Sequence, residues 1–168
     1  GDQLVSTGAI AGGSVLSLAK LDETYDAVED PTHWLMNKTM RRRLTAAARL
    51  YTVGGYITYE KDEFGRTVTM YNDLPILIAD KDNNYDEIMP FTEAAASSTS
   101  QCTSIYCLSF AENGVVGIQN GEMDVRDMGE IDEKPVYRTR VEWLISIAVL
   151  RARAVARLRY IKDGAVAA

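Results

Sequence analysis

The chain has 168 residues, of which 46% are hydrophobic and 25% charged, and these values are ordinary for folded globular proteins and exclude disorder over the whole chain. A chain of this length can bury roughly 70% of its unfolded surface, so it does not need disulfides or metals to fold. The formal net charge of −6 argues against a dedicated nucleic-acid binder, which would normally carry a basic surface. No secretory signal is visible, and no apolar run approaches the ~18 residues of a membrane span.

The first part of the chain predicts a flexible leader and a helix. Residues 1–13 are small and glycine-rich, and Ser14 then stands where a helix N-cap would be. Asp30-Pro31 should end the helix, because the residue before a proline avoids helical angles. Between them, apolar residues recur at steps of three and four, which predicts one buried helical face: Val15, Leu18, Leu21, Tyr25 and Val28.

A buried strand and a second helix are expected next. His33 to Met36 is a short apolar run, and Asn37 can cap a helix that continues to about Leu50. Gly54-Gly55 should stop it. The predicted buried face consists of Met40, Leu44, Ala47 and Tyr51.

From residue 56 the apolar period changes from about 3.6 to 2, which predicts strands. Residues 56–61 and 66–71 should form a hairpin, and residues 75–79 a third strand. Residues 81–101 are polar and predict a loop. The remaining expected elements are a strand at 103–110 in a hairpin with 115–119 across Asn113-Gly114, a strand at 123–128, a charged connector at 129–134, one long strand at 136–149, a short basic helix at 151–161 and a tail at 163–168.

These elements predict an α+β fold with a mixed, mainly antiparallel sheet and two or three flanking helices. Cys102 and Cys107 are five residues apart in a strand, so their side chains should point to opposite faces and form no disulfide.

Catalytic and metal-binding patterns are poorly represented. The single histidine, His33, lies in an apolar run and is interpreted as structural, which nearly excludes a histidine-dependent triad or a multi-histidine metal site. The acids of residues 80–86 resemble a calcium loop, but Tyr85 replaces the required glycine and Phe91 the bidentate acid. Gly8 to Ser14 lacks the Lys-Ser/Thr ending of a phosphate loop. No catalytic residue, metal or cofactor is therefore predicted.

The arginines are concentrated in a few segments, and the acids in others. Such segregation can steer subunits together, although any one arginine can simply be solvated or paired within the subunit. The predicted subunit contacts join arginines of one copy to acids of its neighbour: Arg41, Arg42, Arg43, Arg138 and Arg140 on one side and Glu60, Asp62 and Glu63 on the other.

The order of motifs resembles that of major capsid proteins of tailed bacteriophages. The segment Pro31-Thr32-His33-Trp34-Leu35-Met36-Asn37, followed by a helix with Arg41 to Leu44, is similar to the helix–strand–helix opening of the axial domain of that family. Residues 74–78 and 103–106 resemble its next core strands, although Asp73-Leu74 replaces the usual glycine neighbourhood. Residues 113–121 resemble its hairpin, and residues 127–130 and 134–143 its strand returning to the peripheral domain.

The resemblance implies an HK-ninety-seven-like capsid fold, with residues 14–135 as the axial domain and residues 136–168 as the closing strand and basic end of the peripheral domain. It implies a structural virion protein that assembles in the bacterial host cytoplasm with copies of itself, as pentamers and hexamers of a shell. Scaffolding and portal proteins and non-specifically held DNA are further implied partners; a membrane is not. The N-terminal arm, extended loop and spine helix of the family have no counterpart in this sequence.

Three alternatives stay open from the sequence. Encapsulin nanocompartments share the same fold, so the shell could be of that kind. A small nucleic-acid or regulatory binding module could use Arg138, Arg140 and the arginines of residues 151–159, and steep salt dependence would reveal it. An enzyme with a carboxylate site would need two acids converging in a pocket, which a sequence does not show.

Overall fold

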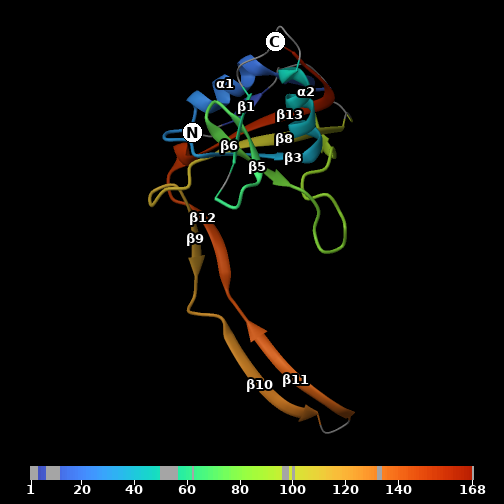
Figure 1. Cartoon of the computed structure of the whole chain (residues 1–168), viewed down its shortest axis with the longest axis vertical. Helices are drawn as coiled ribbons and strands as arrows, with labels where there is room; N and C mark the ends of the chain where they lie inside the picture. Colours follow the sequence, from blue (N-terminus) through green and yellow to red (C-terminus); the bar gives the residue numbers. More distant parts are fainter. Residues whose placement is uncertain are drawn as a thin grey trace.

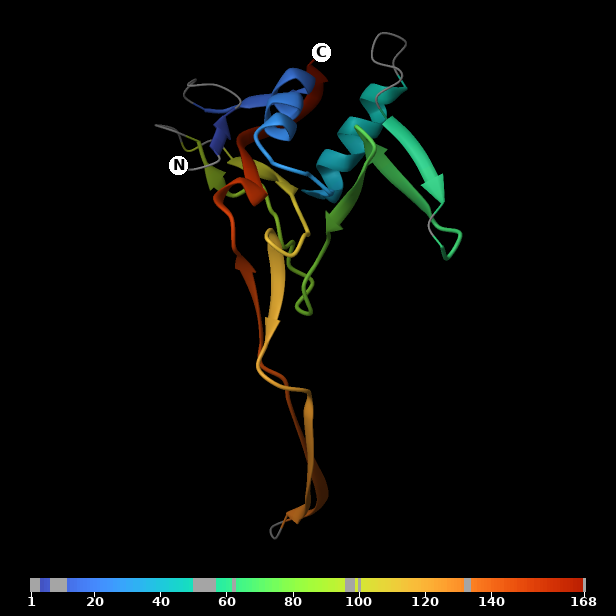
Figure 2. The ribbon, with the colours of Figure 1, turned by 90° about the vertical axis from the view of Figure 1, so that its left-hand side faces the viewer.

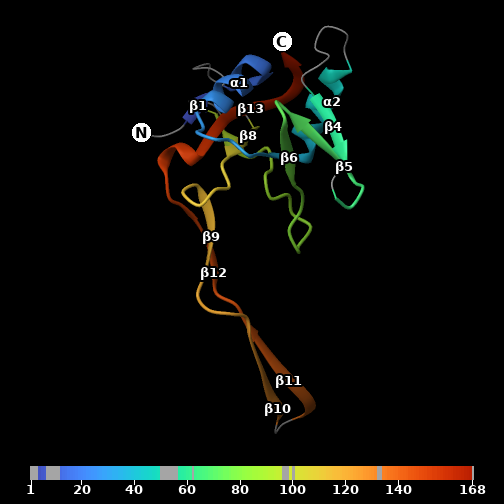
Figure 3. The same ribbon diagram turned by 60° about the vertical axis from the view of Figure 1, so that its left-hand side comes forward.

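A curled sheet and two helices form a body, from which a long two-stranded arm projects (Figure 1). The computed structural model describes residues 4–6, 12–49, 57–61, 63–95, 99, 101–131 and 134–167. The helices are α1 (Leu18–Asp26) and α2 (Lys38–Ala48). Helix α1 lies at the end of the body opposite the arm (Figure 3).

The body contains a nine-stranded mixed sheet in which most neighbouring strands are antiparallel. This arrangement confirms the predicted α+β fold class. Along the main path the strands are β1 (Leu4–Ser6), β13 (Val155–Ala167), β8 (Gln101–Leu108), β3 (His33–Asn37), β6 (Leu74–Ala79), β5 (Thr67–Tyr71) and β4 (Ile57–Lys61). Beside this path, β2 (Ser14–Ser17) pairs with β13 and β7 (Glu93–Ala94) pairs with β8.

The core lies between the sheet and the two helices. Trp34 is fully buried at its centre, where its indole Nε1 donates to the Tyr71 carbonyl at 3.2 Å and the two rings meet edge to face. The hydrogen bond satisfies the polar atom of the largest core side chain, as burial requires. Around it pack Leu21, Met36, Met40, Leu44, Ile105, Leu158 and Ile161.

The segment from β3 to α2 confirms the prediction closely. The Asn37 Oδ1 accepts from the Met40 amide at 2.8 Å and caps the helix, while its Nδ2 donates to the Met89 carbonyl at 3.0 Å. Met40, Leu44 and Ala47 are buried, as predicted, whereas Tyr51 and Gly54-Gly55 lie outside the described residues. The predicted hairpin of β4 and β5 is also present.

The first helix begins later than predicted. Ser14 is not an N-cap, because residues 14–17 form β2 in parallel pairing with β13, and α1 begins only at Leu18 and ends at Asp26 rather than near Pro31. Backbone hydrogen bonds to β13 replace those that a helical turn would make. Leu21 is fully buried and Leu18 and Tyr25 pack against the core, but Val15 is 37% exposed, so its predicted burial was wrong.

The predicted basic helix at residues 151–161 was wrong. A single 3-10 turn, Ala152–Ala154, leads into β13, which lies between β1 and β8. Ala154, Ala156 and Leu158 are fully buried and alternate with more exposed neighbours, which is a strand period. The expected tail from Asp163 continues the same strand to Ala167.

The predicted hairpin between residues 103–110 and 115–119 was also wrong. Both edges of β8 are already occupied, by β13 and β3, so β9 (Val115–Gln119) has no place beside it and pairs with β12 (Ile145–Val149) instead. The long strand predicted at 136–149 is divided at Trp143-Leu144 into β11 (Lys134–Glu142) and β12. Residues 129–131 of the predicted connector belong to β10 (Asp124–Ile131).

The structure thus separates an arm of residues 115–149 from a body that includes residues 155–167. Within the predicted leader, residues 4–6 form β1 beside β13, and residues 1–3 and 7–11 lie outside the described part of the chain. The division at residue 135 into axial and peripheral domains stays a prediction.

Candidate assembly surfaces

The arm consists of two successive ribbons of paired strands, seen end to end in Figure 2. The base ribbon, β9 with β12, leaves the body, and the distal ribbon, β10 with β11, continues it beyond a break in pairing at Trp143-Leu144. Nearly all described side chains of the distal ribbon are exposed. An isolated two-stranded ribbon is marginally stable in water, so this surface is a candidate for contact with another molecule.

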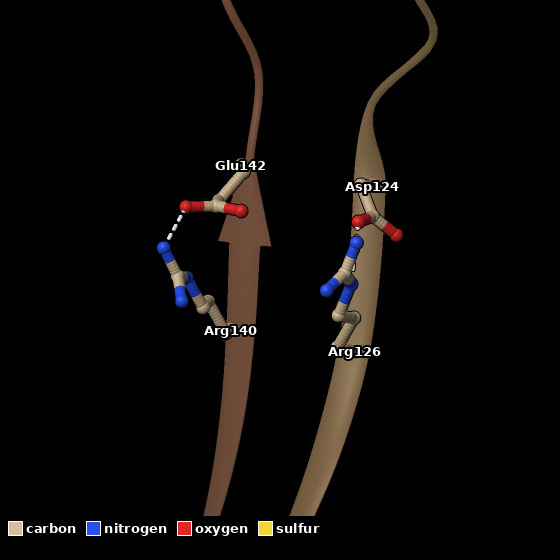
Figure 4. Close-up of polar contacts among 4 residues, drawn as sticks. All are labelled: Asp124, Arg126, Arg140 and Glu142. Carbon is tan, nitrogen blue, oxygen red and sulfur yellow. Dashed lines mark hydrogen bonds and ion pairs between the residues drawn. The ribbon is translucent and has the colours of Figure 1, made fainter.

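One face of the distal ribbon carries charges in rows. Asp124 is paired with Glu142, and two residues further along Arg126 is paired with Arg140 (Figure 4). Side chains two residues apart in a strand share a face, so the two rows and Arg138 together form what we call the charged face. Its carboxylates and guanidinium groups pair along each strand: Arg126 Nε lies 2.6 Å from Asp124 Oδ2, and Arg140 pairs with Glu142.

The base ribbon carries an exposed apolar face that the sequence analysis missed. Ile147 is 77% exposed and lies opposite Gly117, which has no side chain to cover it. Together with Trp143 and Ile145 these residues line a shallow groove of about 270 Å³. Contiguous apolar surface of this kind marks interaction sites in proteins. The large apolar residues at 145, 147 and 149 alternate along the sequence, and this alternation would have predicted a strand with one apolar face.

The three predicted contact arginines of α2 have different surroundings. Arg43 Nε donates to Asp163 Oδ1 at 2.8 Å within the subunit. This hydrogen bond and the attraction between the two charges raise the pKa of Arg43. The same hydrogen bond is the main cause of the lowered pKa of Asp163. Arg42 lines a cavity of about 230 Å³ beside the Lys38–Asp80 ion pair, and Arg41 lines a different one, against β5 and β6. Arg42 and Arg43 thus both act on Asp163, whereas Arg41 lines the other cavity.

The other predicted contact residues lie on separate projections. Glu60 and Glu63 are exposed on the β4–β5 hairpin, and Asp62 lies outside the described residues. Arg138 and Arg140 lie on the distal ribbon, away from α2. Their exposure is compatible with subunit contacts, which stay a prediction.

Two C-terminal arginines pair with acids of the body. Arg151 lies 3.2 Å from Glu29, and Arg157 lies 2.9 Å from Glu93 and over the ring of Tyr106. This pairing neutralises part of the basic surface that a nucleic-acid module would use.

The histidine and the acidic loop take part in local structure. Asp82 Oδ1 accepts from the Asn84 amide at 2.8 Å and the Asp86 amide at 2.9 Å, which closes the loop on itself. Among the described residues no group of three or more His, Cys, Asp or Glu could hold a metal ion. His33 meets Phe110 edge to face, and burial lowers its pKa. No helix in the described ranges is long and apolar enough to span a membrane.

The two cysteines are buried, and both are free. Burial raises the pKa of both thiols, that of Cys107 to about 12. Their environment is that of structural thiols rather than nucleophiles.

No protein-family model matches the sequence. A search of curated proteins found no match either. Among solved structures, the chain is similar to the holo-SrpI encapsulin complex from Synechococcus elongatus PCC 7942, with a TM-score of 0.68 and 20% sequence identity. The match covers 99% of this chain and 55% of the encapsulin chain, so this chain spans about half the length of that protein. The body and its arm together therefore have a capsid-like fold, the fold of an encapsulin shell protein.

Proposed function

We propose that the chain is a structural subunit of a self-assembling protein shell. The observation that carries this proposal is the likeness to the encapsulin, which extends over 99% of the chain and so includes the exposed arm as well as the body. A subunit that repeats in a shell needs projecting, exposed surfaces, and the arm provides one charged and one apolar face of that kind.

Within this class, an encapsulin-type nanocompartment is favoured over the phage capsid that the sequence resemblance suggested. The structural likeness is to an encapsulin, and it gives no support for a virion, a portal, a scaffold or packaged DNA. We further propose that the chain has no catalytic activity of its own and assembles in the cytoplasm of a bacterial cell. The amide contacts of Asp82, the Lys38–Asp80 ion pair and the buried thiols support a role without catalysis.

The direct test is negative-stain electron microscopy of the protein in its longest natural form, together with light scattering of the size-exclusion peak. Closed particles of uniform diameter are the expected result. Particles that co-purify with a defined protein cargo and survive nuclease treatment unchanged would favour the compartment. Nuclease-protected DNA inside them would favour the phage capsid. A protein that stays monomeric across protein concentration and salt would contradict the shell proposal.

A further inference from the structure

Across the two strands of the distal ribbon the order of charges is unfavourable, although each carboxylate pairs with an arginine of its own strand. Two acids, Asp124 and Glu142, lie directly opposite each other, and so do Arg126 and Arg140. Like charges directly opposite in an antiparallel pair are destabilising. If Arg140 and Glu142 exchanged places, the same four residues would form two attractive cross-strand pairs. The observed order therefore allows ion pairs along each strand but places like charges opposite each other across the two strands.

The same order is complementary to itself. The acidic row and the arginine row are two residues apart along both strands, which is about 6.8 Å in an antiparallel ribbon. Consider a two-fold axis that is parallel to the face, at right angles to the strands and midway between the two rows. Rotation about this axis exchanges the acidic row with the arginine row. Each acid of one copy then faces an arginine of the other.

We propose that the charged face of the distal ribbon is a contact surface for the same face of a second copy of this chain, with the two ribbons lying face to face and antiparallel about this axis. Asp124 of one copy then lies over Arg126 of the second copy, and Glu142 lies over its Arg140. The contact is isologous, so one patch serves both partners. It rests on the proposed shell function, and it names the partner of the arm.

The rows also exclude a competing arrangement. A two-fold axis along the strands would place acids on acids and arginines on arginines, and such like-charge juxtaposition disfavours the wrong partner geometry. The charges thus define the relative direction of the two ribbons. Because exposed ion pairs are individually weak and are screened by salt, the contact supplies orientation and register, and many copies in one shell supply the affinity.

Two charge variants test the contact. Arg126→Glu with Arg140→Glu makes both rows acidic, and Asp124→Lys with Glu142→Lys makes both rows basic. Each variant alone should lose assembly, measured as at least a tenfold drop in the pelleted fraction by sedimentation. An equimolar mixture should recover it, because every acidic row then finds a basic one. Circular dichroism and thermal melting should show that both variants stay folded, since the body is not altered.

A matched control changes charge by the same amount elsewhere. Arg49→Glu with Arg153→Glu alters two exposed arginines of the body and should leave assembly unchanged. If this variant fails as completely as the acidic-row variant, net charge rather than the ribbon controls assembly and the proposal is overturned.

Crosslinking tests the geometry independently of particle formation. Protein carrying Asp124→Cys is mixed with protein carrying Arg126→Cys and treated with a short bismaleimide, because facing strands lie about 10 Å apart, too far for a disulfide. The mixture should give a covalent dimer, whereas Asp124→Cys mixed with Val125→Cys, on the opposite face, should give much less. The native thiols are buried and should not react.

The two proposals fail in different ways. The ribbon contact is overturned if normal particles form without the crosslink, or if the acidic-row variant assembles normally by itself. Either result leaves the shell function standing. Crosslinked dimers from a protein that never forms particles would support the ribbon contact and contradict the shell function.

Discussion

Replacing Leu158 by alanine tests whether residues 155–167 belong to the central sheet. Leu158 is fully buried on β13, opposite Ile105 of β8. Truncating a buried leucine removes its transfer free energy and leaves a cavity, at a cost of about 2–5 kcal/mol. For a chain of this length each kcal/mol lowers the melting temperature by roughly 2–4 °C, so the loss should be about 4–20 °C. Leu144→Ala on the arm is the matched control, because Leu144 is 67% exposed.

The assay is urea unfolding followed by tryptophan fluorescence and circular dichroism. All variants carry Trp143→Phe, so that the fluorescence comes from Trp34 of the core, whose ring lies 5.9 Å from that of Tyr71. Leu158→Ala should lower the midpoint without changing the slope, and Leu144→Ala should change the free energy of unfolding by no more than about 0.5 kcal/mol. Equal midpoints for wild type and Leu158→Ala would refute the placement of β13 in the core.

Three further predictions concern the body. Asn37→Ala should lower the free energy of unfolding, measured in urea, by about 1–3 kcal/mol, because it removes the cap of α2 and leaves the Met89 carbonyl without its donor. An unchanged midpoint would contradict the capping role of Asn37. Cys107 should not react with Ellman's reagent at pH 8 in the folded protein, since burial raises its pKa to about 12, whereas it should react fully in guanidinium; rapid labelling of the native protein would contradict its burial. The pKa of the Asp163 carboxyl, measured by carbon-13 NMR, should lie below its ordinary value of 3.8 and should return toward that value in Arg43→Gln; a titration unaffected by Arg43→Gln would exclude the ion pair in solution. The contribution of this carboxylate to stability is present above its unfolded-state pKa and is lost as the pH falls through the lower folded-state pKa.

The sequence alone determined those elements whose signals are local. Asn37 carries both the cap and the boundary between β3 and α2, and the buried face of α2 follows from the spacing of Met40, Leu44 and Ala47. The β4–β5 hairpin joins neighbours in the chain, so its turn and alternation were sufficient. The capsid-like fold was also anticipated, from the order of the motifs rather than from any one of them.

Tertiary structure decided wherever a strand depended on a distant partner. Residues 14–17 and 155–161 have apolar patterns compatible with a helix, but both form strands because distant strands offer backbone groups for pairing. Residues 14–17 pair with β13, and β13 pairs with β8, β1 and β2. Likewise, the two neighbours of β8 exclude β9 from the sheet, and β9 and β12 form the base of the arm. The charged rows followed from this pairing, because residues 124–126 and 140–142 meet only when the register between β10 and β11 is set. Local spacing does not contain that register, which depends on which edges of the sheet are already occupied.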